Sequence, residues 1–538
     1  KQNDSADYFL GGRDATWLAI GASIFASNIG SEHLIGLAGA GASSGMAMAH
    51  WEIQGWMILI LGWVFVPFYT RSMVYTMPEF LERRYNPQSR TILSVISLVS
   101  YVLTKVAVTV YAGGLVFQQV FGIKELWGID FFWIAAIGLV VLTALYTIFG
   151  GMKSVLYTSV LQTPILLLGS LIILVLGFKE LGGWDEMMRV CGAVTVNDYG
   201  DTMTNLIRSN DDANFPWLGA LIGSAIIGFW YWCTDQFIVQ RVLSGKNEME
   251  ARRGTIFGAY LKLLPVFLFL IPGMIAFALH QKYIGAGGEG FLPMLANGTA
   301  NADAAFPTLV AKLLPAGVKG LVVCGILAAL MSSLASLFNS SAMLFTIDFY
   351  KRFKPETPEK KLVGIGQIAT IVIVVLGILW IPIMRSVGDV LYTYLQDVQS
   401  VLAPGIAAAF LLGICWKRTS AQGGMWGLIS GMVIGLTRLG AKVYYSNAGE
   451  VADSTFKYLF YDMNWLFFCG WMFLFCIIVV IVVSLATEAP TAEKIQGLVF
   501  GTATKEQKAA TRASWNHWDI IHTVIILAIT AAFYWYFW

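Results

Sequence analysis

Long apolar runs recur along the whole chain and leave few ways in which it can fold. A helix needs roughly 17 to 25 residues to cross a hydrocarbon core of about 30 Å, and we distinguish thirteen runs of that kind. None of them alternates in the way that a strand of a membrane barrel would. The runs cover 14–42, 49–70, 91–119, 130–149, 155–178, 216–243, 254–280, 316–348, 362–384, 388–415, 422–444, 464–486 and 518–538. The sequence therefore predicts an all-α polytopic membrane protein with about thirteen transmembrane helices.

The composition agrees with a chain whose partner is the lipid bilayer. Charged residues make up 13% of its 538 residues, whereas soluble globular proteins carry about 25%. The net charge of +2 gives no reason to expect a nucleic-acid partner. The six cysteines have neither the spacing of a metal site nor that of a disulfide framework. Because the sequence also lacks a phosphate-binding loop, HExxH and GxSxG, we expect neither an enzyme nor a pump driven by nucleotide hydrolysis.

The positions of the basic residues predict how the chain is oriented. Most of the 35 lysines and arginines fall into loops on one side of the membrane if the chain starts on that side. Cytoplasmic loops carry the excess of basic residues in membrane proteins. We therefore expect a multi-pass protein of the plasma or inner membrane, with Lys1 inside and Trp538 outside.

Two of the apolar runs are interrupted at their centres. The first contains FASNIGSEHLIG at 25–36, and the sixth contains GSAIIGFWYWCTDQFIVQRVL, with Thr234, Asp235 and Gln236 in succession. Because the two interrupted runs, the first and the sixth, are five helices apart and five is odd, the second set of five would run opposite to the first, as in an inverted repeat. We expect one transmembrane domain over 1–538, with repeats over 14–178 and 216–415 and peripheral helices over 422–538.

The first interruption and the eighth run carry groups that suit an ion. Unwound backbone around Asn28 would expose carbonyl oxygens, which a hard cation prefers. Ser332 and Ser333, in LAALMSSLASLFNSS, would add hydroxyl oxygens if their helix passes close to another oxygen source. A Gly/Ser packing face between helices, or serines bonded to their own helix carbonyls, would explain the same residues. Together with the two broken runs, these residues favour an ion site.

Several other polar residues begin or enter apolar runs. Glu52, Lys262 and Gln396 offer donors and acceptors of different kinds, and Tyr231 and Trp232 offer aromatic faces. A sugar requires that mixture, because its hydroxyls both donate and accept while its ring rests on an aromatic face. An alternative is that Glu52 and Lys262 only neutralise one another. For the buried cation of Lys105 we expect a structural partner such as Asp235.

Four segments resemble one family of known transporters. They are GASIFASNIGSEHLIGLAGAGASSG, GWVFVPFYTRSMVYTMPEFLERRY, YWCTDQFIVQRVLSGKN and LMSSLASLFNSSAMLFTIDFY. Between about Asp7 and Trp416 the chain resembles the sodium:solute symporter family, and most closely its sodium/glucose cotransporter branch. The resemblance implies an inverted-repeat core like that of the leucine transporter. That family usually has fourteen helices, so the resemblance also implies a further helix before Lys1.

The resemblance assigns two sets of residues to ligands. Sodium would be held by the backbone carbonyls of Ala26, Ile29 and Ala329 and by the hydroxyls of Ser332 and Ser333. Sugar would be bound by Asn28, His33, Glu52, Tyr231, Trp232, Lys262 and Gln396, with Tyr231 closing the inner side of the site. Sodium is the one cofactor-like ion that we expect, and a small sugar is the expected solute.

By the same resemblance we expect a secondary active symporter that couples inward sodium movement to the uptake of glucose or galactose by alternating access. Relatives that couple a second sodium carry an aspartate where this chain has Ser159 and a threonine where it has Ala335. We therefore expect one sodium per sugar. Two alternatives stay open: a sodium/myo-inositol cotransporter, and a sugar-gated sensor or leak channel that does not concentrate its solute.

Overall fold

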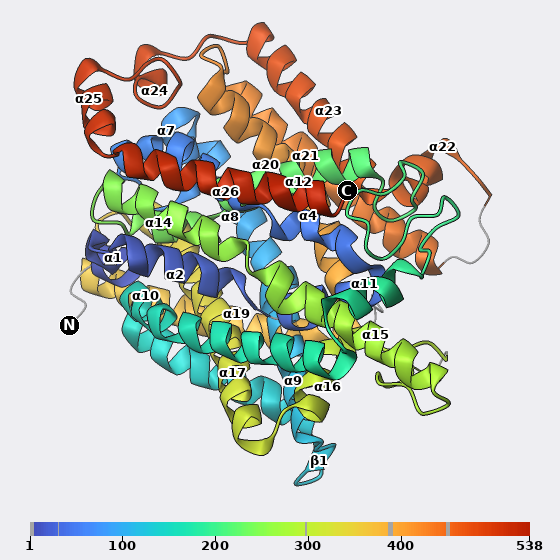
Figure 1. Ribbon diagram of the computed structural model, residues 1–538. Coiled ribbons are helices and arrows are strands. Elements are labelled where there is room, and N and C mark those ends of the chain that lie inside the picture. Colours follow the sequence, from blue (N-terminus) through green and yellow to red (C-terminus); the bar gives the residue numbers. More distant parts are fainter. Residues whose placement is uncertain (1–4, 31, 296–297, 386–390, 448–451) are drawn as a thin grey trace.

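The computed structural model describes residues 5–30, 32–295, 298–385, 391–447 and 452–538. Most of them are helical (Figure 1), and each of the thirteen apolar runs lies mainly in helix where it is described. The positions of Ser31 and of 388–390, which belong to two of these runs, lie outside the described residues. Within the described part, nine stretches are long and apolar enough to span a membrane. Two of the nine each join two neighbouring runs, and the third and eleventh runs are not among them. The expectation of an all-α multi-pass membrane protein is confirmed.

The first five runs form a connected set of helices. Run one consists of α2 (Trp17–Asn28), η2 (Glu32–Leu37) and α3 (Ala38–Ser44), run two of α4 (Ala49–Glu52), α5 (Gly55–Ile60), η4 (Leu61–Phe65) and α6 (Val66–Ser72), and run three of α8 (Pro87–Ser100), η5 (Tyr101–Val106) and α9 (Ala107–Phe121). Runs four and five are joined in α10 (Phe131–Leu181), which bends at Gly151. Gly151 has φ +55°, a conformation that glycine adopts readily, and an added Cβ would lie 2.5 Å from the carbonyl of Tyr8.

The remaining runs follow in the same order along the chain. Runs six to ten comprise α12 (Trp217–Gly228), η6 (Phe229–Thr234), α13 (Gln236–Leu243), α14 (Glu248–Lys262), η7 (Val266–Leu270), α15 (Ile271–Gly285), α17 (Ala316–Met343), η9 (Leu344–Tyr350), α19 (Glu359–Arg385) and α20 (Leu391–Cys415). The last three runs are α21 (Ala421–Asn447), α23 (Trp465–Ala486) and α26 (His517–Tyr536).

Short elements that the sequence analysis did not anticipate fill the connections. They are α1 (Ser5–Leu10), η1 (Gly11–Arg13), η3 (Gly45–Met48), α7 (Met77–Arg84), α11 (Trp184–Gly192), η8 (Ala302–Ala304), α16 (Ala305–Leu313), α18 (Lys351–Phe353), α22 (Thr455–Lys457), η10 (Tyr458–Asp462), α24 (Ala492–Ile495) and α25 (Lys505–Ala513). Strands β1 (Glu125–Leu126) and β2 (Ile129–Asp130) form a small antiparallel hairpin, with Glu125 opposite Asp130. None of these elements is long enough to cross a membrane.

Both predicted interruptions are real. Helix α2 ends at Asn28, Ile29 is extended with ψ 103°, and helix resumes at Glu32. In the sixth run Asp235 is extended with ψ 128°, and its carboxylate accepts a hydrogen bond from the backbone N–H of Phe237, which caps α13. Each break leaves backbone groups at mid-helix without their usual intrahelical partners.

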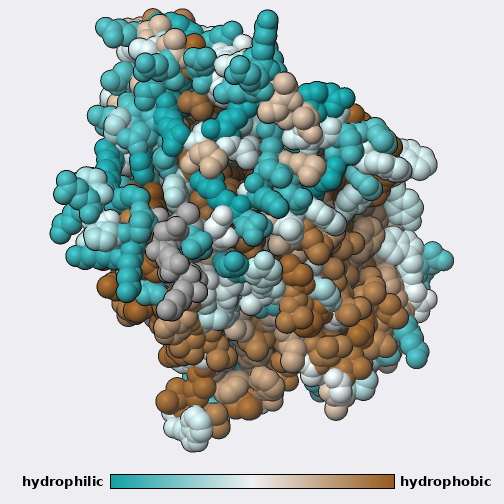
Figure 2. All heavy atoms as spheres, turned by 90° about the vertical axis from the view of Figure 1, so that its left-hand side faces the viewer, coloured by the Kyte–Doolittle hydropathy of each residue, from teal (hydrophilic) through white to brown (hydrophobic). Residues whose placement is uncertain are grey.

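The broken first run lies at the centre of the bundle. Helix α2 packs against α10, α14 and α17, and α10 packs along α17. Helices α20, α21 and α23 pack against one another as a neighbouring group, and α26 lies along α14 and α5 (Figure 1). Figure 2 views the end where the chain begins, with hydrophilic residues over its upper part and a hydrophobic surface on its lower flank.

One close crossing gives a test of the packing. An added Cβ on Gly273 would lie 2.0 Å from the carbonyl oxygen of Ala38, and one on Gly41 would lie 2.2 Å from that of Leu270. We expect Gly273→Ala to destabilise the protein by more than about 1–3 kcal/mol, because the backbones of α3 and α15 must separate. Thermal unfolding in detergent measures this. The control is Gly285→Ala on the same helix, whose added methyl group meets nothing within 4 Å; an equal loss in both variants would contradict the crossing.

Candidate functional site

A small internal cavity lies beside the break in the first run. Its volume is about 40 Å³, and it is lined by Asn28, Glu32, His33, Trp51, Glu52, Gln54, Ile227, Gly228, Tyr231, Trp232, Lys262, Gln396 and Gln399. All seven residues that the sequence assigned to the solute are among these thirteen. The structure therefore brings together side chains from runs one, two, six, seven and ten.

A buried ionic network forms one wall of the cavity. The Lys262 ammonium lies 2.5 Å from Oε2 of Glu52, and Nε2 of His33 lies 3.1 Å from the same oxygen. Nδ2 of Asn28 lies 3.3 Å from Nε2 of His33. The pairing of Glu52 with Lys262, which the sequence analysis offered as an alternative to solute binding, is thus present. Both bonds go to Oε2, and Oε1 of Glu52 has no donor among the residues that the structure describes, so it is available as an acceptor.

The chain places Glu52 and Lys262 at ends of helices. Glu52 is the last residue of α4, and Lys262 is the last residue of α14. The helix cannot continue unchanged past Pro265, which has no N–H to donate, and a different helix, η7, begins at Val266. Polar groups at interrupted helices inside a membrane protein face the protein interior or a cavity, as these do.

Aromatic and amide side chains form the opposite wall. The ring of Tyr231 packs edge-on against Trp232, with centroids 4.9 Å apart. The indole N–H of Trp232 donates to Oε1 of Gln54 at 3.2 Å. Gln396 is 5% exposed, and its Oε1 accepts no hydrogen bond from any residue that the structure describes. A buried acceptor without a partner is unfavourable, so this oxygen is suited to a ligand hydroxyl.

Sequence reasoning did not assign four polar or aromatic residues of the lining to the solute: Glu32, Trp51, Gln54 and Gln399. Glu32 is the most notable, because its carboxylate makes no hydrogen bond or ion pair with the described residues. It stands in the polar FASNIGSEHLIG segment, which was the signal that could have identified it. The cavity thus has two carboxylates and one ammonium group.

Ser333 joins helix α17 to the break in the first run. Its hydroxyl donates toward the carbonyls of Ser27 at 2.9 Å and Ile29 at 3.3 Å. An added Cβ on Gly30 would lie 2.6 Å from that hydroxyl, so glycine allows the close approach. The serine does not bond its own helix, which was the alternative explanation. The carbonyl of Ser27 was not among the predicted ion ligands, and the hydroxyl of Ser27 lies 2.6 Å from that of Ser336.

The other predicted ion ligands lie nearby on the same pair of helices. Ala26 on α2 and Ala329 on α17 are each 1% exposed. The hydroxyl of Ser332 lies 3.3 Å from that of Ser159, which is within reach of the carbonyl of Val155 at 2.6 Å. No group of three or more His, Cys, Asp or Glu side chains in the described part of the chain could hold a metal ion. An ion held here would therefore be coordinated by neutral oxygens, which fits a monovalent hard cation.

The expected partner of Lys105 is confirmed. Its ammonium lies 2.5 Å from Oδ2 of Asp235, and the hydroxyl of Tyr101 donates to Oδ1 of the same carboxylate. The rings of Tyr231 and Phe237 lie 4.6 and 4.5 Å from the ammonium. Both charged side chains are 2% exposed. The pair therefore joins run three to the break in run six, next to the aromatic wall of the cavity.

The sequence of this chain is similar to those of known sodium-coupled cotransporters. Residues 8–431 match the model of the sodium:solute symporter family. The chain is 36% identical over 515 residues to sodium/myo-inositol cotransporter 2 of Homo sapiens, covering 93% of this chain and 75% of that one. It is 37% identical over 516 residues to the sodium/myo-inositol cotransporter of Bos taurus (92% and 71%). It is 38% identical over 499 residues to sodium/glucose cotransporter 1 of Ovis aries (89% and 74%).

Solved structures of two transporters have a fold similar to that of this chain. A sodium-coupled sialic acid symporter in a substrate-bound outward-open state superposes with a TM-score of 0.72 at 22% identity, over 91% of this chain and 94% of that one. The transporter MhsT in complex with L-phenylalanine gives a TM-score of 0.50 at 12% identity, over 88% and 99%. These likenesses confirm the leucine-transporter-like fold that the sequence predicts.

Proposed function

Because the chain belongs to the sodium:solute symporter family, we propose that it carries a neutral cyclic polyol inward together with sodium. Membership of this family makes the protein a sodium-coupled solute symporter of a membrane, and not an enzyme. One observation gives the strongest support to the joint transport of sodium and a cyclic polyol. The break after Asn28 presents backbone carbonyls to Ser333 on one side and Asn28 and His33 to the cavity on the other.

For the solute we propose myo-inositol first and a hexose second. The sequence analysis expected glucose or galactose, with myo-inositol as an alternative. The relatives at 36–37% identity over more than nine-tenths of the chain are named for myo-inositol, and the sheep relative at 38% is named for glucose. Both solutes are six-membered rings with several hydroxyls, which match the mixed donors and acceptors of the cavity.

In the proposed complex each wall of the cavity has its own part. The free oxygen of Glu52 and Oε1 of Gln396 accept from solute hydroxyls, while Lys262 and Asn28 donate to solute oxygens. Nδ1 of His33, which has no partner among the described residues, accepts from a further solute hydroxyl. Trp232 and Tyr231 contact the apolar face of the ring. The cavity of about 40 Å³ has room for roughly one water molecule. Solute binding therefore requires the walls to separate, which is one half of an alternating-access movement between the proposed repeats at 14–178 and 216–415.

Sodium, as the second transported species, would be held by the carbonyls of Ala26, Ile29 and Ala329 and the hydroxyls of Ser332 and Ser333. Ser159 is within hydrogen-bonding distance of its own helix, and Ala335 has no side-chain oxygen, so we propose one sodium per solute. Coupling follows because sodium and solute order the same broken helix, and each then binds better in the presence of the other.

Equilibrium binding tests the choice of solute. We expect labelled myo-inositol to bind the purified protein more tightly than glucose or galactose, and all of them to bind more tightly in sodium than in potassium. If a hexose displaces labelled myo-inositol at lower concentration than myo-inositol itself does, the order of the two proposed solutes is reversed. If none of the three binds in sodium, the cyclic polyol proposal fails.

The unpaired carboxylate in the cavity gives a sharper prediction. Glu32 lines the cavity without a partner among the described residues, so we expect its carboxylate to accept from a solute hydroxyl. Hydrogen bonds to charged groups contribute about 1.5–3 kcal/mol, and Glu32→Gln should therefore weaken solute binding by roughly tenfold or more. Glu186→Gln makes the same change at an exposed ion pair outside the apolar runs and should bind normally. Equal solute affinity in both variants would contradict this role for Glu32.

A further inference from the structure

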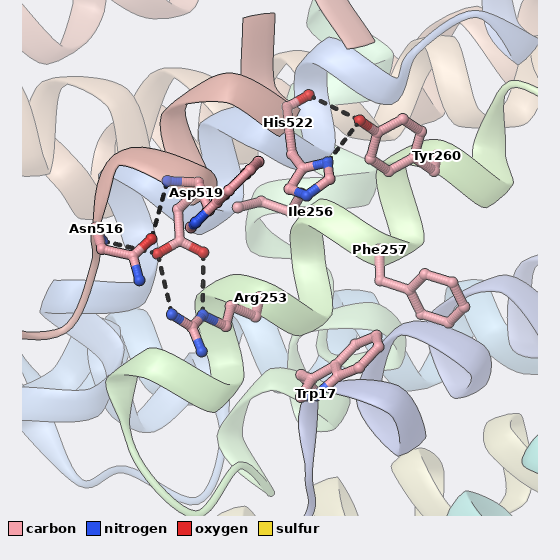
Figure 3. Close-up of a pocket in the computed structure, with 9 residues that line it drawn as sticks. Trp17, Arg253, Ile256, Phe257, Tyr260, Asn516, Asp519 and His522 are labelled. Carbon is pink, nitrogen blue, oxygen red and sulfur yellow. Dashed lines mark hydrogen bonds and ion pairs between the residues drawn. The ribbon is translucent and has the colours of Figure 1, made fainter. Parts of the chain in front are cut away.

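A groove, separate from the central cavity, lies where α2, α14 and α26 meet (Figure 3). Its volume is about 550 Å³, and it is lined by Trp17, Arg253, Ile256, Phe257, Tyr260, Asn516, Trp518, Asp519 and His522. Trp17 is the first residue of α2, and Trp518 is the second residue of α26. The groove therefore opens beside the beginnings of two helices, and no residue of the proposed transport site lines it.

The groove lies at the level where a membrane helix meets the lipid headgroups. Trp17 is 41% exposed and Trp518 is 58% exposed, and tryptophan is enriched at this interface. Most of the apolar surface of α26 faces outward, since only 17% of its membrane-spanning window is buried. From the basic residues we expect this end of the bundle inside the cell, and on that orientation the groove faces the inner leaflet.

The polar groups of the groove are mainly hydrogen-bond donors. The carboxylate of Asp519 is occupied by Nε and Nη2 of Arg253 and by the backbone N–H of Asn516 (Figure 3). Nδ1 of His522 lies 3.0 Å from the hydroxyl of Tyr260. Four other N–H groups have no acceptor among the described residues: Nη1 of Arg253, Nδ2 of Asn516 and Nε1 of Trp17 and Trp518. Such a set of donors suits an acceptor-rich ligand.

The net charge of the groove and its apolar lining limit the class of ligand further. Arg253 pairs with Asp519 at 3.0 Å, so the groove has donors without a large net positive charge. The floor is apolar, formed by Ile256 and Phe257. A phosphodiester provides several acceptor oxygens, and an attached acyl chain covers apolar surface, whereas free phosphate covers none. Arginine is the side chain best suited to phosphate, because its planar fork offers donors on two edges.

We propose that this groove binds one glycerophospholipid of the inner leaflet. Its phosphodiester accepts hydrogen bonds from Arg253 and from neighbouring donors, and one acyl chain lies along the apolar floor beside α26. The bound lipid bridges Trp17, the first residue of α2, to helix α26. This inference does not depend on the identity of the transported solute.

The test compares two arginine variants of the purified full chain. Arg253→Lys keeps a charge beside Asp519 but loses the outer edge of the fork. Arg83→Lys is the matched control, because Arg83 also pairs with a carboxylate, Glu79 at 3.1 Å, and does not line the groove. Native mass spectrometry and thermal unfolding in detergent would follow binding of dioleoylphosphatidylethanolamine, of dioleoylglycerol, which has the same chains without phosphate, and of inorganic phosphate.

We expect the phospholipid to bind and to raise the unfolding temperature of the wild type and of Arg83→Lys. Arg253→Lys should bind it about tenfold more weakly, the ratio expected when a charged hydrogen bond is lost. Dioleoylglycerol and inorganic phosphate should have little effect on any of the three. Equal effects of dioleoylglycerol and phospholipid would overturn the phosphodiester contact, equal effects of inorganic phosphate would indicate a free-anion site, and equal phospholipid affinity in both variants would exclude Arg253 as the contact.

Discussion

Replacing Ser333 with alanine is expected to weaken sodium binding by about 10- to 100-fold and to abolish sodium-driven uptake at ordinary sodium concentrations. The hydroxyl of Ser333 lies 2.9 and 3.3 Å from the carbonyls of Ser27 and Ile29 at the break in α2. Interactions of this strength with a charged partner contribute about 1.5–3 kcal/mol each. The variant also removes the contact that joins α17 to the break. Solute binding should therefore weaken too, and it should lose its dependence on sodium.

The control for this variant lies one turn further along the same helix. Ser336 is equally buried, but its hydroxyl contacts the side chain of Ser27 and not the backbone carbonyls at the break. Ser336→Ala should therefore retain sodium-dependent binding within a few-fold of the wild type. Titration of sodium against labelled solute measures both variants. If Ser336→Ala loses as much sodium affinity as Ser333→Ala, the proposed ligand role of Ser333 is wrong.

Replacing Lys262 with methionine is expected to abolish solute binding and to destabilise the protein by about 3–5 kcal/mol. The side chains of Lys262 and Glu52 are each 4% exposed and their charged atoms lie 2.5 Å apart. Removing one partner of a buried pair leaves the other charge uncompensated, which is the source of that loss. His33, at 3.1 Å from the same oxygen, would remain as the nearest neighbour of the carboxylate. Thermal unfolding and solute binding in detergent are the two measurements.

A double variant separates the two roles of the pair. Glu52→Gln combined with Lys262→Met removes both charges, so it should recover most of the lost unfolding temperature. It should still fail to bind solute, because the ammonium donor and the charged acceptor are both gone. Recovery of solute binding in the double variant would mean that the pair is only structural, as the simpler interpretation of the sequence allowed.

The arrangement of the membrane-spanning helices could be predicted from two features of the sequence. These are the length of the apolar runs and the polar residues that interrupt two of them. The breaks at Ile29 and Asp235 were predictable on those grounds. The fourth and fifth runs were also predicted as separate spans, and the turn at Gly151 lies between them, but their direct connection without a loop was missed. Short helices such as α7 were missed as well, since they are held by capping and by contacts with other segments and carry no long apolar pattern.

The cavity could be predicted in part. Glu52 and Lys262 were conspicuous because isolated charges in apolar runs are rare, and the structure pairs them. Gln54 and Gln399 were not, because a single amide side chain has no distinctive pattern, and only the packing of distant runs brings both to the cavity. The carbonyl of Ser27 was missed for a similar reason. The backbone conformation at the break determines which carbonyl oxygens face α17, and the sequence does not specify that conformation.

The central claim is that sodium and a cyclic polyol move together through the site at the break, and uptake into proteoliposomes tests it most directly. Purified protein would be reconstituted, and labelled myo-inositol, glucose and galactose would be followed under an inward sodium gradient and under a matched potassium gradient. The account predicts accumulation above the outside concentration in sodium and none in potassium. Uptake that proceeds only downhill and at equal rates in the two salts would contradict it and would favour a leak channel or sensor.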